Sequence, residues 1–174
     1  VEDSRGQKET GVVLKSVFSP NMDLAAIFLK PAFLEGRIPF ELSLREPKVT
    51  DPVIALGFPG GREYSRSVLT IFENDYKLRG IKAPFYMTTT DNLTYGNSGG
   101  PLLFGDLKER VAGVAYSLTE DESNVLFTSL KTLKKFMSAL ARDIIVDPLY
   151  REEWLPLFPE FAKNYSNAIA SKKS

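Results

Sequence analysis

A serine flanked by glycines is the feature of this sequence with the clearest chemical potential. Ser98 stands in the run GNSGGP at residues 96–101. A serine hydroxyl attacks a peptide carbonyl only when a base takes its proton and backbone N–H groups stabilise the oxyanion that forms. Glycines permit positive φ and carry no side chain that would block a substrate. We therefore expect the N–H groups of Gly96 and Ser98, with Asn97 between them, to converge as an oxyanion hole.

The base that such a serine normally uses is missing from the sequence. The 174 residues contain no histidine. One carboxylate, Asp23, immediately precedes the apolar segment LAAIFL. It has two interpretations: a turn residue that caps a strand, or the acid of a catalytic triad, which orients an imidazole and stabilises its charged form. The spacing alone leaves both open.

Composition excludes several classes of function. Lys plus Arg and Asp plus Glu number 22 each, so the net charge is zero and gives no support for nucleic-acid binding or for capture by a membrane surface. No apolar run approaches the roughly 18 residues that a membrane-spanning helix needs. Zero cysteine rules out disulfides and metal–thiolate sites, and without histidine a zinc site is disfavoured. We expect no metal and no cofactor.

Short apolar segments separated by turn residues follow one another along most of the chain. Alternating or apolar patterns predict strands within 12–17, 24–29, 53–56, 62–74, 83–91, 100–104, 110–118 and 124–130. Residues 31–51 contain three prolines and predict a connector that runs over a surface. Regular short strands without intervening helices indicate an all-β barrel or sandwich.

The periodicity changes to that of a helix at residues 129–141. The expected apolar face consists of Leu130, Leu133, Met137, Leu140 and Ala141. Beyond it, Pro156 and Pro159 would break a long helix, and one short helix is expected from about Pro159.

Three segments together resemble the trypsin-like serine proteases of the chymotrypsin fold, and most closely their HtrA/Deg branch. DLAAIFL at 23–29 resembles the segment around the catalytic Asp, and VIALGFPGG at 53–61 resembles a strand and turn of that branch. TTTDNLTYGNSGGPLLF at 88–104 resembles the nucleophile segment. The resemblance implies an all-β fold with two six-stranded barrels and the site in the cleft between them. On this reading, 1–45 is the remainder of an incomplete first barrel with its connector, 46–130 the second barrel, and 131–174 a C-terminal helix and tail.

The resemblance also implies roles for individual residues. Asp23 would orient the base, Ser98 would be the nucleophile, and Gly96 and Ser98 would supply the oxyanion hole with Asn97 between them. The family's histidine would fall upstream of Val1, on a preceding segment or a separate chain, so this chain alone is expected to be inactive. Lys15 as a substitute base would lie on a strand outside the cleft. The alternatives are a catalytically inactive binding module on the same fold, or an unrelated β-domain with a coincidental glycine turn.

The resemblance further implies where a polypeptide substrate would bind. The S1 pocket, which holds the P1 residue, corresponds approximately to Asn92, Tyr116, Leu118 and Val125. No Asp stands at its base to bind Lys or Arg, so a shallow pocket for small or medium apolar P1 residues is expected. After Arg142 the chain is too short for a PDZ domain. The tail aromatics would pack back on the barrel, form an oligomer contact or dock onto a missing segment: Trp154, Phe158, Phe161 and Tyr165.

Overall fold

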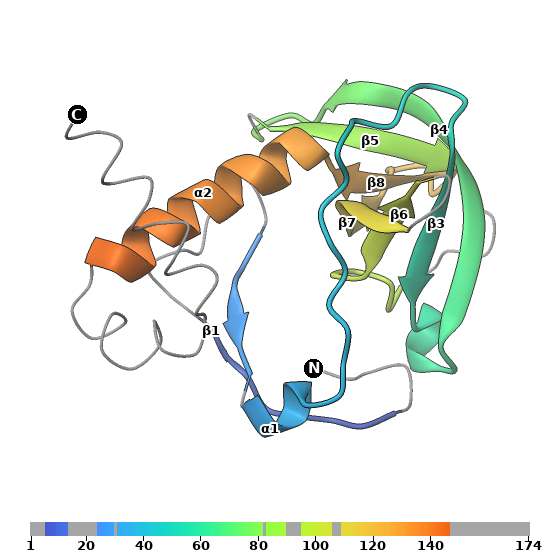
Figure 1. Cartoon of the computed structure of the whole chain (residues 1–174). Helices are drawn as coiled ribbons and strands as arrows, with labels where there is room; N and C mark the ends of the chain where they lie inside the picture. The colour runs from blue at the N-terminus through green and yellow to red at the C-terminus, as the bar shows by residue number, and fades with distance from the viewer. Residues whose placement is uncertain are drawn as a thin grey trace, which may run out of the picture.

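The centre of the molecule is a closed six-stranded antiparallel barrel (Figure 1). The computed structural model describes residues 6–13, 24–29, 31–81, 83–89, 95–105 and 109–146. The barrel order is β3-β4-β5-β8-β7-β6, so each strand is hydrogen-bonded on both sides. The strands are β3 Pro52–Gly57, β4 Ser65–Lys77, β5 Pro84–Thr89, β6 Pro101–Phe104, β7 Arg110–Leu118 and β8 Asn124–Thr128. Closure leaves this sheet without a free edge that could pair with another chain.

Closure depends on the long strand β4 and on the pairing of β3 with β6. Ile54 lies opposite Leu103, and Ala55 lies opposite Leu102, which joins the first barrel strand to the fourth. The register of β4 against β5 shifts on either side of Glu73. Such irregularities bend and twist a strand, and this lets one strand follow the curvature of a barrel.

The barrel interior is filled by the inward-facing residues of all six strands. Tyr86 and Phe127 have no exposed surface and anchor this packing, whereas Phe85, on the opposite face of β5, is equally buried in a separate cluster with Met87 and Leu126. Tyr86 also uses its hydroxyl, which donates to the Glu46 carboxylate and accepts a hydrogen bond from the backbone N–H of Leu130 at 3.0 Å. The main cluster consists of Val53, Ala55, Leu69, Ile71, Tyr86, Leu102, Phe104, Ala112, Ala115, Val125, Phe127 and Leu130.

Helix α2, Leu130–Val146, begins directly after β8 and leads away from the barrel (Figure 1). The Ser129 hydroxyl caps it by accepting from the backbone N–H of Thr132 at 3.2 Å. Leu133 and Phe136 are buried, whereas Met137 is 46% exposed, so the predicted apolar face was wrong at Met137. The buried apolar residues of α2 are Leu130, Leu133 and Phe136, which follow one another at intervals of three residues, so the buried face includes position 136 and not position 137.

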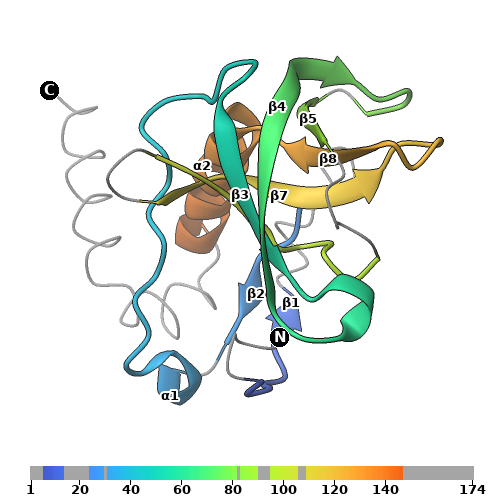
Figure 2. The same ribbon diagram turned by 90° about the vertical axis from the view of Figure 1, so that its right-hand side faces the viewer.

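The N-terminal part contributes a small sheet, a short helix and a long connector. Strands β1, Val12–Val13, and β2, Ile27–Phe28, pair antiparallel. Helix α1, Pro31–Leu34, follows, and the chain then runs from α1 to the start of β3 with little regular structure (Figures 1 and 2). Backbone hydrogen bonds attach this connector to β7, from Ser43 N–H to the Val111 carbonyl and from Val111 N–H to the Glu41 carbonyl, both at 2.8 Å.

The predicted all-β fold with a C-terminal helix is therefore confirmed, and the connector follows a surface as expected. The helix expected from about Pro159 and the tail aromatics lie outside the described residues. Among the helices of the described part, none is long and apolar enough to cross a membrane.

Candidate active site

The loop that carries Ser98 is tied to β7 by backbone hydrogen bonds. The Gly99 N–H donates to the Ala115 carbonyl at 2.9 Å, and the Ala115 N–H donates to the Gly100 carbonyl at 2.8 Å. A tight turn within the loop adds a bond from Gly100 N–H to the Asn97 carbonyl at 2.9 Å. These bonds fix the backbone that follows Ser98 against β7 and close the turn around the serine, which limits the positions that its side chain can reach.

A second loop packs against the loop that carries Ser98. It follows β3 and includes the short 3₁₀ helix Pro59–Gly61, whose Gly60 N–H donates to the Tyr95 carbonyl at 2.5 Å. Gly96 has φ +100, and a Cβ there would lie only 2.3 Å from the Phe58 carbonyl oxygen. Gly96 is thus required by its backbone conformation and by the closeness of this second loop. The segment VIALGFPGG, which contributed to the resemblance, is the structural support of the loop that carries Ser98.

Two further glycines allow the same close approach without an unusual φ. A Cβ on Gly100 would lie 2.1 Å from the Leu56 carbonyl oxygen, and one on Gly57 would lie 2.1 Å from Oδ1 of Asn97. Asn97 is only 5% exposed, so its side chain fills the space between the two loops. The GNSGG run therefore packs backbone against backbone at a spacing that larger residues would not permit.

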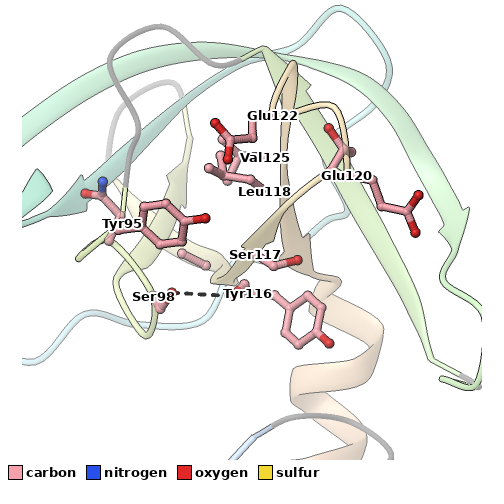
Figure 3. Close-up of a pocket in the computed structure, with 11 residues that line it drawn as sticks. Tyr95, Ser98, Tyr116, Ser117, Leu118, Glu120, Glu122 and Val125 are labelled. Atoms are coloured by element: carbon pink, nitrogen blue, oxygen red, sulfur yellow. Dashed lines mark hydrogen bonds between the residues drawn. The ribbon is translucent and has the colours of Figure 1, made fainter. Parts of the chain in front are cut away.

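Ser98 itself is exposed on the open side of this loop. Its hydroxyl donates to the Tyr116 carbonyl at 3.4 Å, across the gap between the loop and β7 (Figure 3). Within the described residues, the N–H groups of Gly96 and Ser98 donate to no backbone carbonyl. An exposed serine hydroxyl and two backbone N–H groups thus lie on one short, well-supported segment.

A pocket of about 410 Å³ opens next to Ser98. The three described members of the predicted substrate pocket, Tyr116, Leu118 and Val125, all line it together with Ser98 (Figure 3). Asn92 lies outside the described residues. Strands β7 and β8 position the three lining residues, so the structure brings them together with the serine as a single concave surface.

Five other lining residues did not follow from the sequence: Tyr95, Ala115, Thr119, Glu120 and Glu122. Tyr95 comes from the loop that carries Ser98, and Glu120 and Glu122 come from the turn between β7 and β8. Figure 3 shows the Tyr95 ring reaching into the pocket from the side of Ser98. The sequence feature that could have identified Tyr95 as a pocket residue is its position directly before Gly96. For the two glutamates, the corresponding feature is their position directly after the strand that supplies Tyr116 and Leu118.

The β7–β8 turn is held together by a third acidic residue. Asp121 accepts hydrogen bonds from the hydroxyls of Thr119 and Ser123, both at 2.6 Å, and from the Ser123 N–H at 3.2 Å. These bonds, those from Ser123 first, lower the pKa of Asp121 to about 2. Glu122 adopts φ +55, an uncommon backbone conformation for a residue other than glycine. The turn that presents the two pocket glutamates is thus organised by its own side chains.

The other candidate catalytic residues, Asp23 and Lys15, lie outside the described residues. In the described part of the chain, no group of three or more acidic, histidine or cysteine side chains is arranged to hold a metal ion.

Proteins of known structure share this fold. The active form of the Rv3671c protease from M. tuberculosis is 21% identical, with a TM-score of 0.65, over 77% of this chain and 60% of that one. A serine endoprotease from Yersinia pestis is 22% identical, with a TM-score of 0.62, over 82% of this chain and 48% of the other. The chain thus spans about half to two thirds of the length of the proteases that it matches.

A third similar structure is that of an HtrA-type protease. It is the HtrA-type protease AlgW with a tripeptide, 20% identical, with a TM-score of 0.63, over 78% of this chain and 45% of AlgW. No protein-family model matches the sequence, and no curated protein matches it either. The structural similarity confirms the fold that the sequence resemblance implied: this chain has the chymotrypsin-like fold of the HtrA-type serine proteases.

Proposed function

We propose that Ser98 is the nucleophile of a serine endopeptidase. The observation that carries the proposal is the position of an exposed serine hydroxyl at the edge of a pocket of about 410 Å³, on a loop supported from behind by a second glycine turn. A serine kept only for turn formation would not need an adjoining concave surface. The fold shared with HtrA-type serine proteases supports the same assignment.

In the proposed reaction, Ser98 Oγ attacks the carbonyl carbon of the scissile peptide bond and gives up its proton to an imidazole. The N–H groups of Gly96 and Ser98, with Asn97 between them, would stabilise the negative oxygen of the tetrahedral intermediate. The C–N bond then breaks, and the imidazolium protonates the leaving amine. Water hydrolyses the resulting acyl-enzyme with the same imidazole as base, which frees the carboxylic acid and restores the serine.

The imidazole has to come from outside these 174 residues, because they contain no histidine. We propose that an upstream segment or a separate chain supplies it, and that Asp23 orients it. Residues 1–174 alone would then show no peptidase activity. Strong turnover by this chain alone would contradict the proposed base, whatever the role of Ser98.

Labelling with a fluorophosphonate, applied to the full encoded protein, tests the nucleophile. Covalent labelling is expected, and Ser98→Ala should abolish it. Ser117→Ala is the matched control, because Ser117 also lines the pocket and its loss should leave labelling in place. A folded, histidine-containing protein that does not react, or a Ser98→Ala variant that still reacts, would refute the assignment.

The second candidate is a catalytically inactive binding module on the same fold. The absence of histidine from the sequence favours it. On this alternative the pocket would still bind a polypeptide, but no fluorophosphonate would attach to Ser98. The same labelling experiment therefore separates the two functions.

A further inference from the structure

The connector that follows α1 has one backbone edge without a partner strand. On its other edge, Val111 of β7 donates its N–H to the Glu41 carbonyl and accepts from the Ser43 N–H, both at 2.8 Å. In an extended segment the backbone polar groups of successive residues point to opposite sides, so those of Phe40 and Leu42 point away from β7. Within the part of the chain that the structure describes, the backbone groups of these two residues make no hydrogen bond.

The side chains at this edge are apolar and largely in water. Ile38 is 93% exposed and Phe40 is 51% exposed. Residues 37–43 contain no helix or turn, and Figure 1 shows the connector leaving α1 and crossing to the barrel as a single extended trace. Pro39 does not interrupt the edge, because its nitrogen lies on the same side as the Glu41 carbonyl. An unpaired apolar edge of this kind is a template for another strand.

Exposed apolar side chains on the barrel do not offer such an edge. Val68 and Phe72 of β4 are 64% and 62% exposed. Their strand, however, is hydrogen-bonded to β3 on one side and to β5 on the other. Exposure of apolar side chains therefore does not distinguish the connector, but exposure together with an unpaired backbone edge does.

The sequence of this segment is complementary to itself. Residues 37–41 read RIPFE, with a basic residue and an acidic residue at the two ends and an apolar residue on each side of the proline. When two copies run antiparallel about a two-fold axis at Pro39, Ile38 of each copy lies opposite Phe40 of the other, and Arg37 lies opposite Glu41. Apolar pairs and opposite-charge pairs directly across antiparallel strands are both stabilising.

The same register suits the backbone. Ile38 and Phe40 would form the hydrogen-bonded pairs, in which each residue exchanges both of its backbone bonds with the residue opposite. The two Pro39 residues would face each other in a non-hydrogen-bonded pair, where neither needs an N–H. The free edge and the order of side chains along it therefore agree on one register.

Arg37 and Glu41 also have partners within their own chain. The Arg37 guanidinium donates to the Gln7 side chain at 2.6 Å, and the Glu41 carboxylate accepts from Arg110 Nε at 3.1 Å. A guanidinium has five N–H donors and a carboxylate has two acceptor oxygens, so each can bind more than one partner. The Glu41 side chain is 53% exposed, which leaves it accessible to a second copy. A charge pair between copies would add to the internal contacts.

We propose that two copies of this chain associate by pairing residues 37–41 of their connectors as antiparallel strands about Pro39. A second copy is the occupant that the segment fits, because its charges and apolar residues complement those of an identical segment. The contact is short, and interfaces that bury less than about 1,200 Å² are typical of weak, transient association. The dimer is therefore expected to form reversibly with concentration. The proposal does not depend on peptidase activity, because the connector lies outside the Ser98 pocket.

Analytical ultracentrifugation of the full encoded protein, over a concentration series up to the millimolar range, tests the association. The unsubstituted protein is expected to show a monomer–dimer equilibrium. Phe40→Pro removes an N–H from the free edge of each copy and should weaken the dimer at least about tenfold. Ile38→Ser should weaken it about threefold. Val68→Ser is the matched control, because it shortens an exposed aliphatic side chain on β4, and it should change nothing.

Charge reversal at the two ends of the segment tests the identity of the partner and the register. Arg37→Glu alone, or Glu41→Arg alone, places like charges opposite each other in both pairs and should weaken self-association about fivefold or more. An equimolar mixture of the two variants restores an opposite-charge pair at both positions, so the mixed dimer should regain the strength of the unsubstituted one. A protein that stays monomeric throughout the series would overturn the proposal. An assembly that Phe40→Pro leaves unchanged, or a mixture that does not regain association, would overturn it as well.

Discussion

The barrel and the N-terminal region differ in how they bury their apolar residues. Barrel residues such as Ile71 and Leu102 are 1% and 0% exposed. In the N-terminal region, Val13 and Ile27 are 46% and 48% exposed, and Ile38 in the connector is 93% exposed. The barrel therefore encloses a core of its own, whereas β1, β2 and the connector do not enclose one among the described residues.

The buried residue of the N-terminal region, Leu24, packs instead against side chains of the barrel and of α2. Leu24 packs with Leu133 and Phe136 of that helix, and Leu42 and Val111 lie against the same cluster. The candidate site therefore lies on the barrel, which is the region that encloses a core of its own. Ser98 and its pocket belong entirely to the barrel strands and their turns. Stability of the site and stability of the N-terminal region can therefore be perturbed separately.

The largest expected difference between the barrel and the N-terminal region is in the stability lost when an isoleucine in each is replaced by alanine. Ile71→Ala should lower the free energy of unfolding by about 2–5 kcal/mol, because it leaves a cavity in the barrel core. Ile27→Ala should change it by no more than about 0.5 kcal/mol, since half of that side chain is already in water. Urea unfolding followed by circular dichroism measures both. Similar losses for the two variants would mean that the N-terminal region is packed as tightly as the barrel.

The second test adds one methyl group at a glycine of each region. At Gly100 a Cβ would lie 2.1 Å from the Leu56 carbonyl oxygen, whereas at Gly36 it would meet nothing within 4 Å. Gly100→Ala should lower the free energy of unfolding by about 1–3 kcal/mol, because the loop that carries Ser98 must move away from β3. Gly36→Ala should cost about 1 kcal/mol through its φ of +69 alone.

The readout that separates these two glycines is the rate of fluorophosphonate labelling at Ser98 in the full encoded protein. We expect Gly100→Ala to slow labelling, because the loop carries the N–H groups of the proposed oxyanion hole, and Gly36→Ala to leave the rate unchanged. An unchanged rate in Gly100→Ala would show that the close approach of the loop to β3 does not position the serine.

The third test measures the contact between the two regions. In a double-mutant cycle, Leu24→Ala and Phe136→Ala should show a coupling energy of about 0.5–2 kcal/mol, because the two side chains share one buried cluster. A cycle between Leu24 and Phe85 serves as the control, since Phe85 packs in a different cluster. Its coupling should stay within about 0.5 kcal/mol. Equal couplings would contradict a local contact.

Most of the barrel was predictable from the sequence because each strand carries its own pattern. Residues 110–118 form β7 as expected, and of the strand predicted at 124–130 residues 124–128 form β8, while Leu130 already belongs to α2. The buried face of α2 was less predictable. Periodicity placed Met137 on that face, but α2 packs on Leu24 through Leu133 and Phe136, so Phe136 is buried and Met137 is not. Which face of a helix is buried depends on distant contacts that the local sequence does not contain.

The candidate site was predictable where it depends on a motif, and less so where it depends on turns. The GNSGGP run identified Ser98, and the strand after it identified Tyr116 and Leu118 as pocket residues. Glu120 and Glu122 were not foreseen, because a turn carries no periodic pattern that shows which side chains face a cavity. Gly96 was assigned to substrate access, yet its contact with the Phe58 carbonyl gives an equally strong reason for glycine.

The smallest expected effect concerns the turn that presents the pocket glutamates. Hydrogen bonds from Ser123 and Thr119 stabilise the ionised form of Asp121 and lower its pKa from 3.8 to about 2. The stabilisation is therefore fully present above pH 3.8 and is lost as the pH falls through about 2. An NMR titration of the side-chain carboxyl carbon should give this pKa directly. Ser123→Ala should move it back toward 3.8, because Ser123 provides the largest contribution. A value near 3.8 in the unsubstituted protein would mean that the turn is not held by these bonds in solution, and that Glu120 and Glu122 are not fixed at the pocket by Asp121.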